Sequence, residues 1–237
     1  MRVIAFKVWS DFAHFRKHYT TSSPLTHSIP PPSALRGLVG AMLGFSRKEY
    51  YEILRLEKAS FGVRIISPIK KVRIPLNYID TKDGAWVTRP PKGRLHTQVR
   101  VEFLKDPVYE IFVHHQHNDL MDILSEMLRN HKTIFTPYLG ITECIANFEF
   151  LWDVDVYPIS GMLEVLSAFR IRDLKEFKLE DGVGIVKERV PVFIDSNRIR
   201  QKAEEVVFNP RGKPIIARLE RVFTYPNGKG QSFTFLN

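Results

Sequence analysis

A basic stretch interleaved with rings gives the sequence its clearest chemical signal. Between Arg64 and Lys105 ten basic residues face only three acidic ones, and this window carries +7 of the chain's net +9. Tyr78, Trp86 and His96 are interleaved with the charges. Cations neutralise phosphates and rings stack on unpaired bases, so the mixture favours single-stranded RNA. The alternative is a solvated surface hairpin whose rings pack on the body of the protein.

The return strand of this hairpin concentrates polar groups on one face. In an extended chain alternate residues point the same way, which gives one face made of Arg94, His96, Gln98 and Arg100. The other face has Leu95, Val99 and Val101, which can supply packing. The polar face is either solvated or turned toward RNA, and we favour RNA. The predicted binding residues of the hairpin are therefore Arg89, Lys92, Arg94, His96, Gln98 and Arg100.

A second basic position is predicted at the start of a helix. Ser33 follows three prolines and is read as an ordinary N-cap. Free N–H groups at such a helix start attract phosphate, which makes Ser22 and Arg36 candidates as well. An Arg in the first turn opposes the helix dipole, so Arg36 is predicted to clamp a phosphate.

The histidines are candidates for metal binding and for catalysis. His115 and His117 would share a strand face, but Cys144 is the only thiol and no zinc-ligand spacing accompanies them. We therefore predict no metal and no cofactor. Metal-free RNA cleavage needs a general base and a general acid, which His14, His18, His27 and His96 with Tyr19 and Lys17 could supply. A metal-independent endoribonuclease stays open as the alternative function.

Composition narrows the class of protein. The pI of about 9.6 favours a polyanionic partner, although the charge could also serve solubility. One cysteine excludes a disulfide framework within the chain. The first ten residues lack a signal-peptide pattern, and no run reaches the roughly 20 apolar residues of a membrane helix. We expect a soluble cytoplasmic protein without a membrane partner.

The elements that must position these residues follow an α+β order. Strands are predicted at 2–9, 61–74, 99–104, 108–114 and 147–156, with a loop at 11–29 and helices starting at Ser33, Arg47 and Asn118. This order fits a ferredoxin-like βαββαβ domain over residues 1–157, with a long basic hairpin inserted at about 70–105. Residues 158–237 are predicted to form a small, mostly β region that includes one short helix at 161–169. Gly37, Gly40 and Gly44 at near-helical spacing predict that something packs very close to the first helix.

Three stretches resemble a known family. Asp11 to Gly44 reads DFAHFRKHYTTSSPLTHSIPPPSALRGLVGAMLG, with an aromatic-basic segment, a Ser/Thr-rich loop, a proline cluster and a glycine-containing helix. Pro137 to Ala146 reads PYLGITECIA, and Arg94 to Val113 reads RLHTQVRVEFLKDPVYEIFV. In this order they resemble the Cas-five family of CRISPR-associated proteins, which belongs to a repeat-associated RNA-binding superfamily. The resemblance covers about residues 1–157, fades beyond them, and is closest to subtypes I-A and I-B.

The resemblance implies a structural role in an RNA-guided complex. A Cas-five subunit caps the 5′ handle of the guide RNA (crRNA) in a type I surveillance complex (Cascade), and its inserted hairpin acts as a thumb. The implied partners are the crRNA, the repeated backbone subunit and the large subunit, with target DNA contacted only through the complex. In the family's aromatic-basic segment, Arg16 and Lys17 are predicted to contact phosphate. For Tyr19, base stacking and inward packing both stay open.

Overall fold

The computed structural model is a mixed α/β fold dominated by strands. It describes residues 1–20, 23–79, 96–178, 184–197, 199–226 and 231–236. Its centre is a four-stranded antiparallel sheet in the spatial order β3-β6-β1-β7. The chain runs through this sheet and its helices in the order β1 (Arg2–Trp9), α1 (Pro32–Leu43), α2 (Glu49–Ile53), β3 (Ala59–Ile65), β6 (Val108–His115), α3 (Asn118–Arg129) and β7 (Asn147–Asp155).

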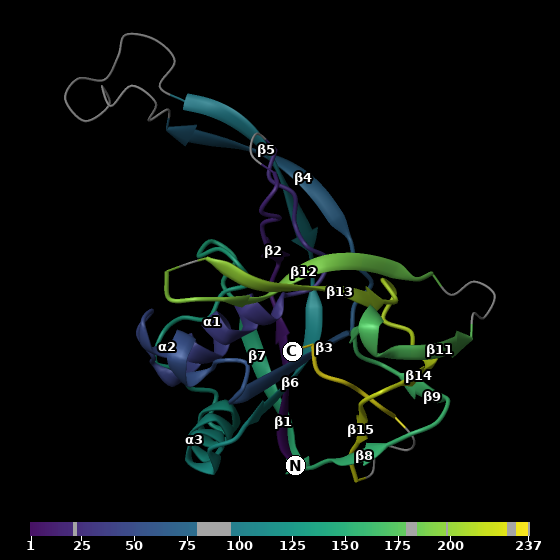
Figure 1. Ribbon diagram of the computed structural model, residues 1–237. Helices are drawn as coiled ribbons and strands as arrows, with labels where there is room; N and C mark the ends of the chain where they lie inside the picture. Colours follow the sequence, from purple (N-terminus) through teal and green to yellow (C-terminus); the bar gives the residue numbers. More distant parts are fainter. Residues whose placement is uncertain (21–22, 80–95, 179–183, 198, 227–230, 237) are drawn as a thin grey trace.

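The two faces of this sheet are covered by different parts of the chain. Strand β1 alternates, so that Ile4, Phe6 and Val8 pack in the main core with side chains of α1 and α3. Val3 and Ala5 point the other way, into a cluster with Phe112, Trp152, Phe233 and Phe235. The helices therefore cover one face of the sheet, and the chain around Phe233 and Phe235 covers the other (Figure 1). Both faces of β1 are buried, which explains its nearly continuous apolar sequence.

A separate ribbon rises from this body. Strands β4 (Lys71–Ile79) and β5 (His96–Lys105) pair along their whole described length, and the short β2 (Phe12–Ala13) pairs with the base of β5. In Figure 1 the ribbon projects well beyond the sheet and helices. The single strand predicted over 61–74 is two strands, because the chain leaves the sheet after Ile65 and pairs again only from Lys71, with Pro68 between them lacking an N–H for a ladder hydrogen bond.

The C-terminal part consists of small sheets. They have the orders β10-β13-β12, β11-β14-β9 and β15-β8. Their strands are β8 (Tyr157–Ile159), β9 (Leu163–Val165), β10 (Phe169–Arg170), β11 (Leu174–Lys178), β12 (Val186–Ile194), β13 (Arg200–Phe208), β14 (Ile215–Leu219) and β15 (Val222–Thr224), with a 3-10 turn at Ile171–Asp173. The helix predicted at 161–169 is wrong, because Leu163 and Val165 pair with Ala217 and Ile215 as strand β9.

The start of helix α1 differs from the prediction, whereas the capping box before α2 does not. Helix α1 begins at Pro32 with Pro31 as N-cap and no side-chain cap, so Ser33 is not the cap. Proline suits the first helical position because the missing N–H would have no helical partner there. The predicted capping box before α2 is confirmed: Ser46 N–H donates to Glu49 Oε2 at 2.8 Å, and Glu49 N–H to Ser46 Oγ at 3.4 Å.

Candidate nucleic-acid interface

The β4–β5 ribbon has one apolar and one polar face. Its register pairs Leu76 with Val99 and Ile74 with Val101, and these side chains form a cluster with Phe103 and Cys144. The opposite face is exposed and carries Arg73, Asn77, His96, Gln98 and Arg100. The apolar face fixes the ribbon to the body at its base. The polar face is thereby presented to solvent along a strand pair that extends away from the body.

The predicted polar face of the return strand is confirmed for three of its four residues. His96, Gln98 and Arg100 lie on one face, with Val99 and Val101 opposite. Arg73 on β4 joins Arg100 as a diagonal neighbour, and neither arginine has an ion-pair partner among the described residues. Arg89, Lys92 and Arg94 lie outside the described residues, so their predicted roles stay predictions.

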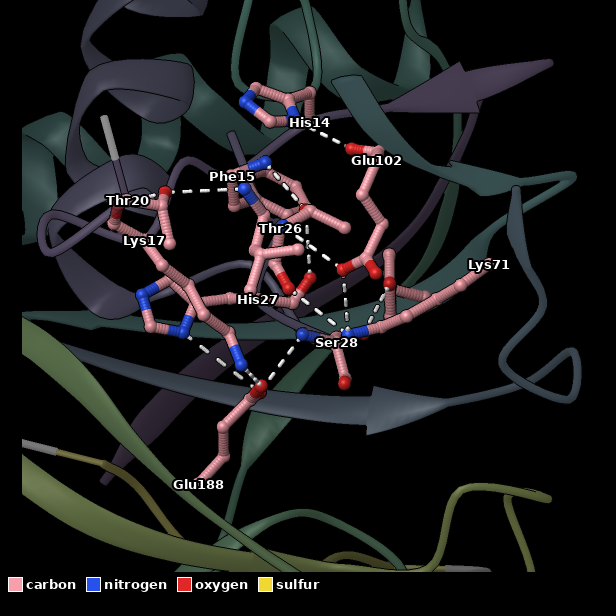
Figure 2. A network of polar contacts seen from close by, with 12 residues as sticks. His14, Phe15, Lys17, Thr20, Thr26, His27, Ser28, Lys71, Glu102 and Glu188 are labelled. Atoms are coloured by element: carbon pink, nitrogen blue, oxygen red, sulfur yellow. Dashed lines mark hydrogen bonds and ion pairs between the residues drawn. The ribbon is translucent and has the colours of Figure 1, made fainter. Parts of the chain in front are cut away.

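A polar network anchors the base of the ribbon to the N-terminal segment 14–28, as Figure 2 shows. Lys71 Nζ lies 3.3 Å from Glu102 Oε1 across the strand pair and donates to the Thr26 carbonyl at 3.0 Å. Thr26 N–H donates to the same Glu102 carboxylate at 3.2 Å. The His14 imidazole lies 2.7 Å from the Glu102 carbonyl oxygen. Segment and ribbon are therefore held together as one unit.

The same segment is tied to the C-terminal part through Glu188 of β12. Lys17 Nζ lies 2.6 Å from Glu188 Oε1, and Ser28 N–H donates to Glu188 Oε2 at 2.9 Å (Figure 2). Burial lowers the pKa of Lys17, but the hydrogen bond and charge of Glu188 outweigh it and raise that pKa above its usual value. Lys17 is largely buried, and its charge is already neutralised by Glu188. The predicted phosphate contact of Lys17 stays a prediction.

Arg16 and Tyr19 are displayed on the outside of this segment. Arg16 is exposed and donates to the Thr20 carbonyl at 3.0 Å, which holds its guanidinium near the surface. Tyr19 is 64% exposed and meets the His18 ring edge-on at 5.2 Å between centroids. Inward packing of Tyr19 is therefore wrong, while base stacking stays a prediction. Ser22 lies outside the described residues.

The hairpin β12–β13 adds cations that the sequence prediction missed. Arg200 Nη1 donates to His18 Nε2 at 2.6 Å. Burial and the charges of Arg200 and Arg189 lower the pKa of His18, so both arginines act on the same part of the surface. In Figure 1 this hairpin crosses the body near the foot of the ribbon. The basic residues of 187–189 and 200–205 are the signal in the sequence, but the acidic residues among them reduce the net charge of both stretches.

The predicted phosphate clamp at Arg36 is wrong. Arg36 is 1% exposed, donates from Nε to the Leu54 carbonyl at 2.6 Å and from Nη1 to the Val192 carbonyl. Its guanidinium also lies against the rings of Phe61 and Phe193. Burial lowers its pKa to about 10. Strand β12 covers the helix here, so Arg36 holds α1 to the C-terminal part instead of facing solvent.

The histidines do not gather into one reactive cluster. His14 and His27 are buried at 4% and 1% exposure, and burial lowers the pKa of His27 to about 4. The ring nitrogens of His114 and His115 contact the carbonyls of Arg2 and Ile53 at 2.8 and 3.0 Å. In the described part of the chain, no group of three His, Cys, Asp or Glu side chains could hold a metal ion. Over the same residues, no helix is long and apolar enough to cross a membrane.

Comparisons with solved structures support the fold. A crystal structure of a CRISPR protein from Archaeoglobus fulgidus superposes with a TM-score of 0.57 at 14% identity, covering 98% of this chain and 97% of that one. A chain of a CRISPR RNA-guided surveillance complex gives 0.56 at 16% identity, covering 91% of each chain. A chain of the Type III-B Cmr-beta complex gives 0.52 at 14%, covering 92% and 86%. The mixed α/β fold is thus shared with proteins of CRISPR complexes.

The family follows from the sequence match. The model of the family described as CRISPR-associated protein (Cas_Cas5) matches residues 3–204. The chain therefore belongs to this CRISPR-associated family. The match also continues past residue 157, where the sequence resemblance fades, and includes β12 and the first part of β13. The comparison with curated proteins found no match.

Proposed function

We propose that this protein is an RNA-binding structural subunit of a type I CRISPR surveillance complex and holds the 5′ handle of the crRNA. The observation that carries the proposal is the two-faced β4–β5 ribbon, whose exposed face has Arg73 and Arg100 without an ion-pair partner in the described part of the chain. Cations on a protruding strand pair suit a sugar-phosphate strand, because phosphate contacts supply most sequence-independent affinity.

The body fits a ferredoxin-like βαββαβ domain, and the ribbon fits its thumb. The sheet order β3-β6-β1-β7 corresponds to second, third, first and fourth strands of that layout, with α1 and α3 on one face. The ribbon is inserted between the second and third of these strands. The RNA would follow the polar face of the thumb to Arg16 and Tyr19 at its foot, and pass Arg189 and Arg200 there.

Protein partners are the repeated backbone subunit and the large subunit. Support comes from large apolar side chains after α3, with Ile134, Phe135 and Ile145 exposed by 63%, 51% and 64%. Large apolar side chains that are exposed in this way are available to a protein partner. One structural relative belongs to an RNA-guided surveillance complex and another to a complex bound to target RNA, as their descriptions state. A cytoplasmic location is part of the same proposal.

We infer a binding role without catalysis. His14 and His27 are buried, which keeps two of the four candidate histidines from the 2′-hydroxyl of a bound RNA. His18 is engaged by Arg200. Incubation of the pure protein with repeat RNA in EDTA should leave the RNA intact. Specific cuts that disappear when His18 or His96 is replaced would instead support the endoribonuclease.

The binding claim is tested by measuring RNA affinity at several salt concentrations. A fluorescent repeat-derived RNA should bind with an affinity that falls steeply as salt rises, because bound cations release counterions. A duplex DNA with the same number of phosphates serves as control and should bind more weakly, since its bases are not free to stack. Salt-independent binding, or no binding of either nucleic acid, would contradict the proposal.

A further inference from the structure

Helix α1 and its C-cap position contain three glycines, and only two of them are explained by packing within the chain. A Cβ atom at Gly40 would lie 2.8 Å from Tyr50 Cβ. Gly44 has φ +80, and a Cβ atom there would lie 2.8 Å from Ile134. At Gly37 a Cβ atom would meet nothing within 4 Å. A helix with an internal glycine is less stable than one with alanine at the same position. Gly37 therefore lowers the stability of α1, although no contact of the described residues requires a glycine there.

The space above Gly37 is a cavity of about 170 Å³. It lies between α1, the segment around Phe15, the start of α2 and the loop at 138–140. Its lining includes Phe15, Ser33, Gly37, Ala41, Tyr50 and Tyr138. Pockets for whole small-molecule ligands are several times larger. The volume and the three aromatic rings instead suit a single flat ring system.

The charges around this cavity favour a ring that is attached to phosphate. Arg16 is exposed directly after Phe15. Arg47 lies three residues before Tyr50, and its charge offsets a small part of the rise in the pKa of Tyr50 that burial causes. The hydroxyls of Ser33 and Tyr138 can hydrogen-bond a base edge. Aromatic rings beside cations are the usual chemistry of single-stranded nucleic-acid sites.

We infer that this cavity holds one unpaired nucleobase of the bound RNA, seated over Gly37. The inference rests on the proposed function, because the base belongs to the RNA that the ribbon and Arg16 hold. Gly37 is then glycine because a side chain there would occupy the space of the base. The site adds a contact to a base where the ribbon supplies contacts to phosphates.

Two substitutions at one position test the inference. Gly37→Leu fills the cavity, and no described atom lies within 4 Å of its new Cβ to resist it. Gly37→Ala is the graded comparison, because it favours the helix and its methyl group takes up only part of the cavity. Anisotropy titrations use a labelled repeat RNA and a set of the same RNA with one abasic nucleotide at each position in turn. Thermal unfolding of each variant verifies that it is folded.

The expected result is a coupling between the protein change and one RNA position. For the unaltered protein one abasic site should weaken binding on the order of tenfold, which is the contribution of a stacked base. Gly37→Leu should weaken binding of the intact RNA by the same factor, and that abasic site should then have no further effect. Gly37→Ala should weaken binding of the intact RNA by a smaller factor, because one methyl group takes up only part of the space of the base. If Gly37→Leu does not fold, Tyr138→Ala at a 41% exposed ring should show the same coupling.

Other outcomes overturn the inference. Wild-type affinity for Gly37→Leu, or a loss that couples to no abasic position, would mean that no base enters the cavity. Normal RNA binding with lost binding of a neighbouring subunit would assign the cavity to a protein side chain. Failure of the unaltered protein to bind any repeat RNA would contradict the proposed function itself, so the two failures are distinguishable.

Discussion

Replacing Arg36 separates a structural role from a phosphate-binding role. Its guanidinium donates to the buried carbonyls of Leu54 and Val192, which lie in α2's C-cap and in β12. Charged hydrogen bonds contribute roughly 1.5–3 kcal/mol each. Burial disfavours the positive charge of Arg36, as its lowered pKa of about 10 indicates. This cost offsets roughly 3 kcal/mol of the stabilisation from the two hydrogen bonds.

The expected losses follow from these opposing effects. Arg36→Met keeps most of the volume, removes the buried charge and leaves two carbonyls without a donor, so unfolding should become easier by about 2 kcal/mol. Arg36→Ala also opens a cavity beside Phe61 and should cost about 4 kcal/mol. Arg55→Met, at an arginine that is 47% exposed, is the control and should change stability by less than about 0.5 kcal/mol.

Urea denaturation followed by circular dichroism measures these differences, and salt titration of RNA binding gives the second readout. The structural role predicts lower stability with an unchanged dependence of RNA affinity on salt. A phosphate clamp predicts the reverse, with the log–log salt slope reduced by about 0.7 for one lost phosphate contact. Unchanged stability in Arg36→Met together with a reduced slope would refute the reasoning.

Two more predictions concern the network around Glu188. Burial lowers the pKa of His27 from 6.5 to about 4, so the unfolded chain takes up the proton at a higher pH than the folded protein does. The free energy of unfolding should therefore fall by roughly 3 kcal/mol as the pH drops from 6.5 to 4. Chemical denaturation at several pH values in this range should show a weaker dependence of stability on pH in His27→Gln. An equally steep profile in that variant would contradict the assignment. Glu188→Ala leaves the largely buried Lys17 without its partner and should cost about 3 kcal/mol, whereas Glu205→Ala, which breaks the exposed pair with Lys187, should cost less than about 0.5 kcal/mol. Equal losses in the two variants would show that the buried pair has no special role.

The sequence predicts well those features that depend on local periodicity. Alternation in β5 indicated that His96, Gln98 and Arg100 share a face, because side-chain direction in a strand follows from spacing alone. Ser46 and Glu49 indicated a capping box for the same reason, since both partners lie within one helical turn. The polar face of the ribbon could therefore be predicted before its position in space was known.

Features that depend on distant segments could not be predicted in this way. A basic residue in the first turn of a helix is exposed in most settings, but β12, 156 residues further along the chain, covers Arg36. Lys17 meets Glu188 across a similar separation, and nothing near Lys17 indicates it. The apolar residues at 163–165 fit a helix or a strand until β14 supplies a partner. Pairing partners decide these cases, and periodicity does not identify them.

The central claim is that cations on the exposed face of the β4–β5 ribbon contact RNA phosphates. The most direct measurement is the salt dependence of repeat-RNA affinity for the double variant Arg73→Ala and Arg100→Ala, compared with the double variant Arg55→Ala and Arg218→Ala at exposed positions elsewhere. The ribbon variant should bind more weakly, with a log–log slope smaller by about 1.4 for two lost phosphates, while the control keeps the wild-type slope. An unchanged slope in the ribbon variant, with the fold intact, would contradict the account.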